Sequence, residues 1–492
     1  MEIIVLAAGG ELALERIMKL NPTGLAYDSR RVEKGYIFFA IKGLVRDGHD
    51  FIPEAVARGA IGVVAEREVE VPPGVVLEVV PNTRRALAWA AAQFYGYPSR
   101  KLHVVGVTGT NGKTTTTHLL RSLYQEQGKK VGLIGTLYVK LGEKIFPGER
   151  TTPESLDLQS WLARMVEEGI EVAVMEVSSH GLALERVTGV AFDVAVFTNL
   201  TQDHLDFHRD LEDYFQAKAR LFTELLTGKP GKKLAVINRD DPYGQRLLSL
   251  CQGAEVLTYG LRKGEVHALD YELRPEGTRL LANAGGERVE VRLSLPGLFN
   301  VYNALAALAV AVGEGMSLDL AARALSRVQA VPGRCERIDE GQDFTVLVDY
   351  AHTPDGLLNI LRTARDISRG RVIVVFGCGG DRDPSKRPVM GRIAGEHADF
   401  VVVTSDNPRS EDPVAIMQAI AQGLAQVAPP SRYLLIADRE AAIREAFARA
   451  RPGDIVILAG KGHENCQIIG DERIPFDDRE VARRLLREMK TR

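Results

Sequence analysis

The chain has 492 residues, of which 45% are hydrophobic and 26% are charged, and its formal net charge is −3. At roughly 150 residues per domain this length predicts about three domains, and the near-neutral charge argues against nucleic acid or an anionic membrane as a partner. The sequence has no apolar run of the ~18 residues that a membrane span needs, and its four cysteines lie far apart, which suits a reducing, cytoplasmic location.

The first hundred residues alternate short apolar runs with polar turns. The run at residues 3–8 lies between two glutamates and lacks a basic flank, so we predict no signal peptide. Apolar runs at 36–41 and 61–65, followed by helical spacing over 83–95, indicate strands and a helix. We therefore predict a small N-terminal α/β domain over residues 1–99.

A second unit, residues 100–332, alternates strand-like and helical patterns. Residues 114–126 have helical spacing, and residues 301–312 have the Ala- and Leu-rich composition of a buried helix. Residues 271–296 alternate around glycines, which predicts antiparallel hairpins appended to a sheet. The valine-rich strand-like runs are residues 102–106, 172–177, 194–197 and 234–237. Because helical stretches separate these runs, we predict a mostly parallel sheet.

A third unit, residues 333–492, follows a Val-Pro-Gly hinge and repeats the strand–helix alternation. Its strand-like runs are residues 344–348, 372–376, 400–403, 433–436 and 455–458. The loops after these runs are rich in Gly, Asp, His and Arg, and ligands of open α/β sheets bind at such strand ends. The predicted fold class is thus α/β with three domains, a central P-loop domain with a mostly parallel sheet standing between the small N-terminal domain and a C-terminal Rossmann-like domain.

The strongest local motif is Thr-Gly-Thr-Asn-Gly-Lys-Thr-Thr at residues 108–115, between a predicted strand and a predicted helix. Glycines let the backbone wrap around phosphate oxygens, and the free N–H groups of the helix start donate to them. Lys113 would neutralise the β- and γ-phosphates, and the Thr114 hydroxyl can bind Mg²⁺. Val107 stands where the strict P-loop pattern has its first glycine, so a plain glycine-rich turn is the alternative interpretation.

A second glycine-rich run, residues 377–380, follows a predicted strand of the third unit. It resembles a dinucleotide-binding fingerprint, but Arg382 occupies the position of the final glycine. A redox cofactor is therefore a weak hypothesis for this run.

Three further side chains in the central unit are candidates for the reaction. Glu176 ends a predicted strand, where a carboxylate can hold nucleotide-bound Mg²⁺ or simply be solvated. His204 lies in a polar loop, and a lone loop histidine is usually solvated. Lys218 points with the apolar stripe of the helix predicted over residues 211–222, which indicates either a buried, nucleophilic amine or a lysine that reaches out at the edge of the stripe.

Taken in their order along the chain, these motifs resemble the Mur ligase family. The matching segments span nearly the whole chain and are residues 28–30, 109–115, 175–181, 198–204, 214–222, 295–303, 349–355, 377–383 and 460–464. Each could occur by chance alone, but their joint order is specific.

The resemblance implies roles that spacing alone does not assign. It implies that Lys113 and Thr114 bind ATP and Mg²⁺, that Glu176 and His204 hold two Mg²⁺ ions, and that Lys218 carries a carbamate formed with CO₂ beside the metal. The other implied nucleotide contacts are Gly109, Thr110, Asn111, Gly112, Thr115, Asn303, Arg334, Asp349 and His352. The implied contacts with the UDP-sugar dipeptide are Ser29 on the uridine side and Thr151, Thr152, Ser178 and Arg186.

The run Asp-Asn-Pro-Arg at residues 406–409 is the best guide to the amino acid that is joined. The guanidinium of Arg409 is a planar fork suited to a carboxylate. Diaminopimelate carries a second amino-acid head where lysine has only an ammonium, and a site built on such a polar pair can discriminate by roughly 10⁴-fold. A turn with a solvated arginine is the alternative. The other implied contacts are Arg382, Asp406, Asn407, Pro408, Gly460 and Glu464.

The activity implied by the resemblance is the ATP-dependent addition of meso-diaminopimelate to UDP-N-acetylmuramoyl-L-alanyl-D-glutamate through an acyl phosphate. That step belongs to peptidoglycan precursor synthesis, and so to cell shape and division. The alternatives within enzymes are a lysine-adding ligase of the same family and a folylpolyglutamate synthase. A non-catalytic P-loop module or an NTP-driven switch is the alternative from another class. We expect a cytoplasmic monomer that binds these substrates and no nucleic acid.

Overall fold

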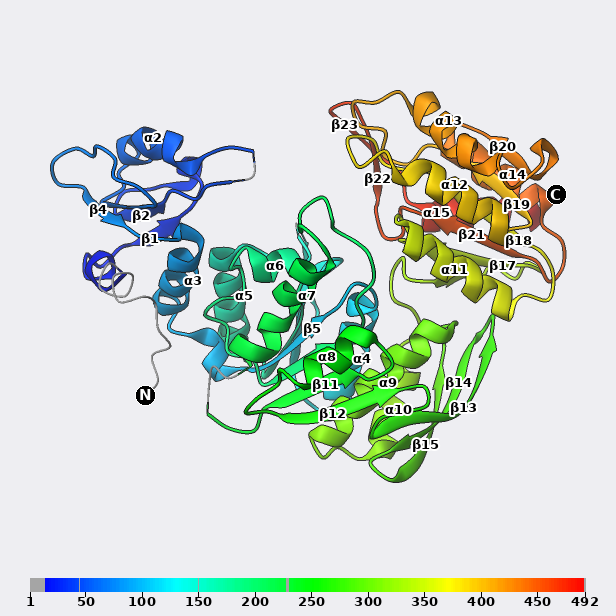
Figure 1. Ribbon diagram of the computed structural model, residues 1–492, viewed down its shortest axis with the longest axis horizontal. Coiled ribbons are helices and arrows are strands. Elements are labelled where there is room, and N and C mark those ends of the chain that lie inside the picture. The colour runs from blue at the N-terminus through cyan, green and yellow to red at the C-terminus, as the bar shows by residue number, and fades with distance from the viewer. Residues whose placement is uncertain (1–13, 44, 149, 227–229, 491–492) are drawn as a thin grey trace.

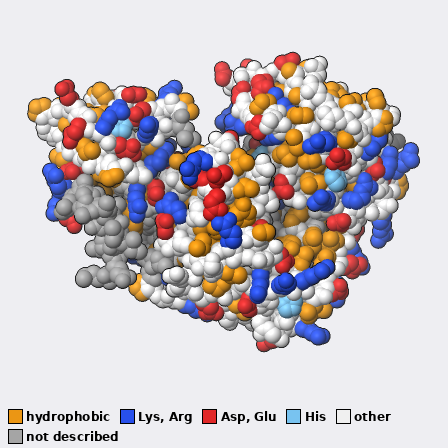
Figure 2. Space-filling view, viewed as in Figure 1, with side chains coloured by type: hydrophobic (Ala, Val, Ile, Leu, Met, Phe, Trp, Pro, Cys, Tyr) orange, Lys and Arg blue, Asp and Glu red, His pale blue; other side chains and the backbone are white. Residues whose placement is uncertain are grey.

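A computed structural model describes residues 14–43, 45–148, 150–226 and 230–490, so the apolar run at residues 3–8 lies outside the described residues. The chain forms three units in sequence order, each built on its own sheet (Figure 1). Acidic and basic side chains are interspersed over the face in Figure 2, and the surface is hollowed between the N-terminal and C-terminal units. Among the described residues, no helix is long and apolar enough to cross a membrane.

The N-terminal unit is a four-stranded parallel sheet in the order β1-β2-β3-β4. Its strands are β1 (Gly24–Ala26), β2 (Tyr36–Phe39), β3 (Gly62–Ala65) and β4 (Val76–Val79). Its helices include α2 (Ile52–Ala57) and α3 (Thr83–Phe94), and the Asn82 side chain caps α3 by accepting from the N–H of Arg85. Apolar cores cover both faces of this sheet.

The central unit is an eleven-stranded sheet in the order β15-β14-β13-β12-β11-β10-β5-β9-β6-β7-β8. The strands are β5 (His103–Thr108), β6 (Val131–Ile134), β7 (Tyr138–Leu141), β8 (Lys144–Pro147), β9 (Val172–Glu176), β10 (Val194–Phe197), β11 (Leu234–Asn238), β12 (Glu255–Gly260), β13 (Val266–Arg274), β14 (Gly277–Ala284) and β15 (Glu287–Leu293). The middle of the sheet is parallel, and β13–β15 are antiparallel hairpins, as the glycine-rich alternation predicts.

Helices cover both faces of the central sheet, which explains why its strands are continuous apolar runs. They are α4 (Lys113–Glu126), α5 (Ser155–Glu167), α6 (Ser179–Ala183), α7 (Leu211–Arg220), α8 (Pro242–Leu248), α9 (Leu298–Gly313) and α10 (Leu318–Ser326). Helices α4, α9 and α10 share one core with the sheet, and α5 and α7 share the other. The predicted helix over residues 211–222 is α-helical to Arg220 and continues as a π-helical turn, Leu221–Leu225.

The C-terminal unit is a six-stranded sheet in the order β16-β17-β21-β18-β19-β20, parallel except for the edge strand β16. The strands are β16 (Glu336–Ile338), β17 (Thr345–Asp349), β18 (Val372–Phe376), β19 (Phe400–Val403), β20 (Tyr433–Leu435) and β21 (Ile455–Ala459), with a separate hairpin of β22 (Cys466–Ile469) and β23 (Glu472–Pro475). The helices are α11 (Pro354–Ile367), α12 (Lys386–His397), α13 (Pro413–Leu424), α14 (Arg439–Arg449) and α15 (Asp478–Lys490). Since β17, β18, β19 and β21 run parallel, the loops that follow them meet at one edge.

Candidate active site

The loop between β5 and α4 has the geometry of a phosphate cradle. Gly109 has φ +149°, and a Cβ there would lie 1.8 Å from Thr198 Oγ1, so a side chain has no room. Val107 is fully buried in β5 and pairs with Val196 of β10. The strand therefore runs past the position where the strict motif has its first glycine, and the glycine turn opens two residues later.

Lys113 begins α4 and folds back over the loop. Its Nζ donates to the carbonyl oxygens of Gly109 at 2.8 Å and Thr110 at 2.7 Å. Burial lowers the pKa of Lys113, while the charges of Glu176 and Asp203 oppose that shift. Lys113 is thus held at the mouth of the cradle, close to two carboxylates.

Glu176 is buried at the end of β9 and lies against the start of α4. Its Oε2 accepts from Thr114 Oγ1 at 3.1 Å and from Thr136 Oγ1 at 3.0 Å, and its Oε1 accepts from the Thr136 N–H at 2.9 Å. Thr136 also lies 3.0 Å from the Thr151 hydroxyl. Sequence reasoning missed Thr136, although it follows β6, whose carboxyl end reaches the same sheet edge as that of β9.

Lys218 is only 1% exposed, so the solvated-edge alternative is wrong for this side chain. Its Nζ donates to Gly109 O at 2.8 Å and lies 4.4 Å from the centre of the Tyr214 ring. Burial, and then repulsion from Lys113, hold the pKa of Lys218 well below its usual range. Burial therefore disfavours the charged form of this side chain.

His204 has a left-handed backbone, with φ +55°, in the loop after β10. Its ring lies 4.8 Å from that of His180 and 6.1 Å from that of Tyr214, and burial lowers its pKa. Asp203 interacts electrostatically with Lys113, Lys218 and His204. Asp203 is thus the anion shared by this cluster, a role that the sequence did not reveal.

The predicted nucleotide contacts outside the loop lie around it. Asn303 is buried on α9, and its Oδ1 accepts from Thr116 Oγ1 at 3.2 Å. The Arg334 guanidinium stands 4.9 Å over the Tyr350 ring. Asp349 accepts from the Cys335 N–H at 2.7 Å, and burial raises its pKa to about 6 while Arg334 opposes that shift.

The C-terminal unit touches the phosphate loop directly through Asp355. Its Oδ2 accepts from Asn111 Nδ2 at 2.9 Å and from Thr201 Oγ1 at 3.0 Å. The sequence did not single out this residue. These two bonds hold the start of α11 beside the phosphate loop.

A cleft of ≈ 1020 Å³ opens between the central and C-terminal units. Its lining includes Gln202–Asp206 from the central unit and Asp355 from the C-terminal one. The predicted site residues that line it are His204, His352, Arg382, Asp406, Asn407, Arg409, Gly460 and Glu464. Candidate residues for metal and for the amino acid therefore share one cavity, and Arg409 faces it rather than bulk solvent.

The glycine run after β18 makes room for the loop that carries Arg409. A Cβ on Gly380 would lie 1.9 Å from the Pro408 carbonyl oxygen, and one on Gly379 would lie 2.9 Å from Arg409 Nη1. Pro408 itself is buried and is not part of the cleft lining. The run therefore leaves room for the loop that carries Arg409 to pack against it.

The residues predicted to contact the UDP-sugar dipeptide lie beside Glu176 in the central unit, except for Ser29, which lies in the N-terminal unit. Arg186 pairs with Glu154 at 2.8 Å, and Arg84 of the N-terminal unit reaches the same carboxylate at 3.4 Å. Thr152 is fully buried, where its hydroxyl donates to Glu176 O and accepts from Ser178. Ser29 donates to Glu54 at 2.8 Å within the N-terminal unit.

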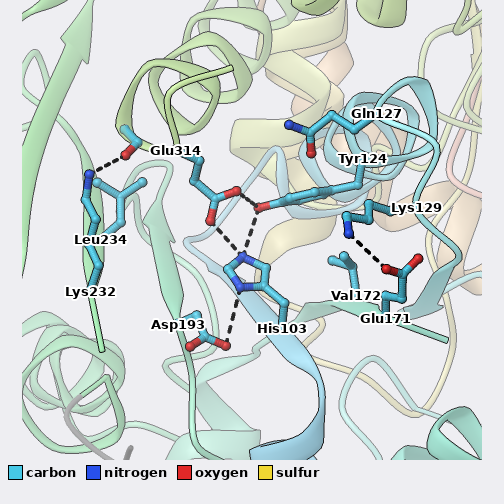
Figure 3. A pocket seen from close by; sticks show the side chains of 11 residues that line it. His103, Tyr124, Gln127, Lys129, Glu171, Val172, Asp193, Lys232, Leu234 and Glu314 are labelled. Atoms are coloured by element: carbon cyan, nitrogen blue, oxygen red, sulfur yellow. Dashed lines mark hydrogen bonds and ion pairs between the residues drawn. The ribbon is translucent and has the colours of Figure 1, made fainter. Parts of the chain in front are cut away.

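A second cavity, of ≈ 610 Å³, lies at the opposite end of β5 and α4 from the cradle (Figure 3). Its ionisable groups are paired with one another, except for Lys232, which pairs with Glu255 outside the lining at 2.9 Å. His103 Nε2 lies 2.7 Å from a Glu314 oxygen, the Tyr124 hydroxyl donates to the other at 2.7 Å, and Lys129 pairs with Glu171 at 2.9 Å. Because α4 spans about 21 Å at 1.5 Å per residue, these groups are too far from the cradle to act there.

The fold and the cleft define an α/β protein with a phosphate loop, which its C-terminal unit contacts through Asp355. The chain belongs to the Mur ligase family. It matches the Mur ligase family, catalytic domain, over residues 21–95, the Mur ligase middle domain over residues 107–311, and the Mur ligase, glutamate ligase domain, over residues 333–462.

Individual relatives agree with this membership. The chain is 50% identical over 468 residues, 94% of each chain, to UDP-N-acetylmuramoyl-L-alanyl-D-glutamate–2,6-diaminopimelate ligase of Syntrophomonas wolfei. It is 51% identical over 475 residues, 95% of this chain and 96% of the other, to the protein of the same name from Geobacillus kaustophilus. A solved structure of a ligase of that name has 35% identity and a TM-score of 0.69, and covers 95% of each chain.

Proposed function

We propose that the chain is an ATP-dependent ligase that adds meso-diaminopimelate to UDP-N-acetylmuramoyl-L-alanyl-D-glutamate in peptidoglycan precursor synthesis. The relatives at about half identity over nearly the full length carry this activity in their names. The observation that supports it most is the single cleft in which His204 and Arg409 lie, with Asp355 bonded to the phosphate loop.

The proposed division of labour follows the three sheets. Residues 1–99 would bind the UDP-sugar, residues 100–332 would bind ATP, and residues 333–492 would bind the amino acid. The γ-carboxylate of D-glutamate attacks the γ-phosphoryl group of ATP, giving an acyl phosphate and ADP. The amine of diaminopimelate then attacks the acyl carbon, and phosphate leaves as the amide forms.

Lys113 is the residue that we propose binds the transferred phosphoryl group. In the ligand-free chain its ammonium donates to two loop carbonyls, 2.8 and 2.7 Å away. Phosphate oxygens are stronger acceptors than carbonyls, so bound ATP would draw the ammonium from them. Lys113 would then stabilise the charge that spreads over the phosphoryl oxygens in the transition state.

The donor set near the cradle fits Mg²⁺. Thr114 Oγ1 and Glu176 Oε2 lie 3.1 Å apart and are the hard oxygen ligands that this ion prefers. Thr114, Glu176, His204 and the carbamate proposed for Lys218 would hold the two ions. When bound, the ions would neutralise phosphate charge.

We also propose that Lys218 carries a carbamate. Carbamate formation needs a neutral amine, and burial lowers the pKa of Lys218, which disfavours its charged form. The modification replaces an amine whose charged form is repelled by Lys113 with an anion that attracts Lys113. It also adds oxygen atoms beside the residues proposed for Mg²⁺.

Two alternatives within enzymes are less favoured. A lysine-adding ligase would bring an ammonium towards Arg409, where like charges repel. A folylpolyglutamate synthase of Mycobacterium tuberculosis has a TM-score of 0.64 and covers 83% of this chain and 95% of its own, but at 21% identity it shares the fold alone. A monomeric state and a cytoplasmic location stay predictions.

The test is release of ADP by the purified chain with UDP-N-acetylmuramoyl-L-alanyl-D-glutamate and a panel of meso-diaminopimelate, lysine and glutamate. We expect release only with the muropeptide precursor and diaminopimelate together. Equal rates with lysine would refute the proposed selectivity. Release without any amino acid would favour an NTP-driven switch.

A further inference from the structure

The loop that carries Arg409 is built onto the β22–β23 hairpin. The Arg409 N–H donates to Ile468 O at 3.0 Å, and the Gly470 N–H donates to Arg409 O at 2.7 Å. The loop thus lies beside β22 as an additional, parallel segment. Arg409 has φ +52°, a left-handed conformation that a non-glycine residue adopts at a cost, so the backbone bonds on either side hold it there.

Backbone and side-chain groups of the hairpin, and of the turn that precedes it, form further hydrogen bonds with the same loop. Gln467 Nε2 donates to the Asp406 carbonyl at 3.0 Å, and the Ile468 N–H donates to Asn407 Oδ1 at 3.0 Å. Asn407 Nδ2 in turn donates to Glu464 Oε2 at 2.8 Å. The loop, the hairpin and Glu464 are therefore one connected hydrogen-bond network.

Lys461 is at the centre of this network and is fully buried. Its ammonium donates to Asn407 Oδ1 at 3.2 Å, to Glu464 Oε2 at 3.0 Å and to the Cys466 carbonyl at 2.7 Å. These three acceptors match the three donors of an ammonium. Lys461 does not line the cleft, whereas its neighbour Gly460 and its partner Glu464 do.

We propose that Lys461 and the β22–β23 hairpin are the positioning device of the amino-acid site. They set the distance between the Arg409 guanidinium and the Glu464 carboxylate, and so the length and charge pattern of the head group that fits between them. Glu464 uses Oε2 for both of its protein donors within the described residues, which leaves Oε1 for an incoming ammonium. This inference rests on the proposed function. It assigns the selectivity for diaminopimelate to residues that support the site without contacting the amino acid.

Two variants test the device in the full-length chain. Lys461→Met removes the ammonium, and Gln467→Glu turns a donor into an acceptor that faces carbonyl oxygens, at nearly constant size. A misplacement of about 1 Å costs up to roughly 100-fold, so we expect the KM for meso-diaminopimelate to rise about tenfold or more. The preference for diaminopimelate over lysine in kcat/KM should fall, and the KM for ATP should stay within about twofold.

The control is Arg369→Ala, an exposed position between α11 and β18, at the opposite end of the strands from the cleft and outside both the hairpin and the loop network. It should leave both KM values unchanged. If Lys461→Met does not fold, as judged by its melting temperature, Gln467→Glu decides alone. An unchanged KM for diaminopimelate in a folded variant would overturn the positioning role, and so would an equal rise in the KM for ATP.

The wild-type panel separates this inference from the proposed function. If the wild-type chain prefers lysine, the proposed function is wrong, and the same variants are measured with lysine to decide the positioning role. If no amino acid supports ADP release, both proposals fall. If diaminopimelate is used and the variants match wild type, only the positioning role falls.

Discussion

Arg409 is the side chain on which amino-acid selectivity should depend, and Arg409→Asn is the cleanest change. The backbone of Arg409 has φ +52°, a conformation that asparagine adopts far more readily than alanine. Arg409→Asn therefore removes the guanidinium without adding strain to the loop. Arg409→Lys is the companion variant, since it keeps the positive charge and loses the planar geometry.

The size of the effect follows from the donors that Arg409 has free. One N–H of Nη1 is used by the Gly380 carbonyl at 2.6 Å, and the half-buried guanidinium presents its remaining donors to the cleft. Two charge-assisted hydrogen bonds to a carboxylate contribute about 1.5–3 kcal/mol each when buried, and we take the lower value because the group is half-exposed. The expected loss is then about 3 kcal/mol, or roughly 150-fold.

The assay is kcat/KM for meso-diaminopimelate and for lysine, from ADP release at saturating ATP and muropeptide. Arg409→Asn should lower the value for diaminopimelate by roughly 150-fold, Arg409→Lys by about tenfold, and neither should lower the value for lysine. The KM for ATP is the internal control. A parallel loss of ATP affinity, or an unchanged value for diaminopimelate, would refute the role assigned to this side chain.

Three further changes test other parts of the site. Lys218→Met should abolish ligation while the fold persists. Intact-protein mass spectrometry of the wild-type chain in bicarbonate should show the added mass of one CO₂. An active wild-type chain with an unmodified Lys218 would contradict the carbamate. Asp355→Ala removes two hydrogen bonds between the central and C-terminal units, at 2.9 and 3.0 Å, so the ligand-free variant should have a larger radius of gyration in small-angle scattering than wild type. An unchanged radius of gyration would show that these bonds do not hold the two units together. His118 lies on α4, where its Nδ1 is 2.7 Å from the Thr114 carbonyl oxygen, and burial holds its pKa at about 4, below its usual 6.5. The unfolded chain therefore binds the extra proton first as pH falls. Stability that is present above the usual pKa is therefore lost as the pH falls from 6.5 to about 4, and the free energy of unfolding should be about 2 kcal/mol lower at about pH 5. In urea unfolding, His118→Gln should lose less stability than wild type by that amount. An identical loss in both would contradict the lowered pKa of His118.

Local patterns in the sequence determined the elements and the nucleotide loop. The runs at Val194–Phe197, Val372–Phe376 and Phe400–Val403 form strands with the predicted bounds, because strands buried on both faces need continuous apolar residues. The phosphate loop is also local, since Gly109 and Lys113 act on neighbours a few residues away. The order of motifs sufficed to indicate the family.

Only the tertiary structure decided which polar side chains support the site. Thr136 meets Glu176 across 40 residues, Lys461 meets Asn407 across 54, and Asn111 meets Asp355 across 244. Hydrogen bonds require donor and acceptor within about 3 Å, and that proximity is set by strand order and by the packing of one unit on another. A polar residue in a loop has the same appearance in the sequence whether it is solvated or holds such a partner, so its role emerges only when the sheets bring the loop ends together.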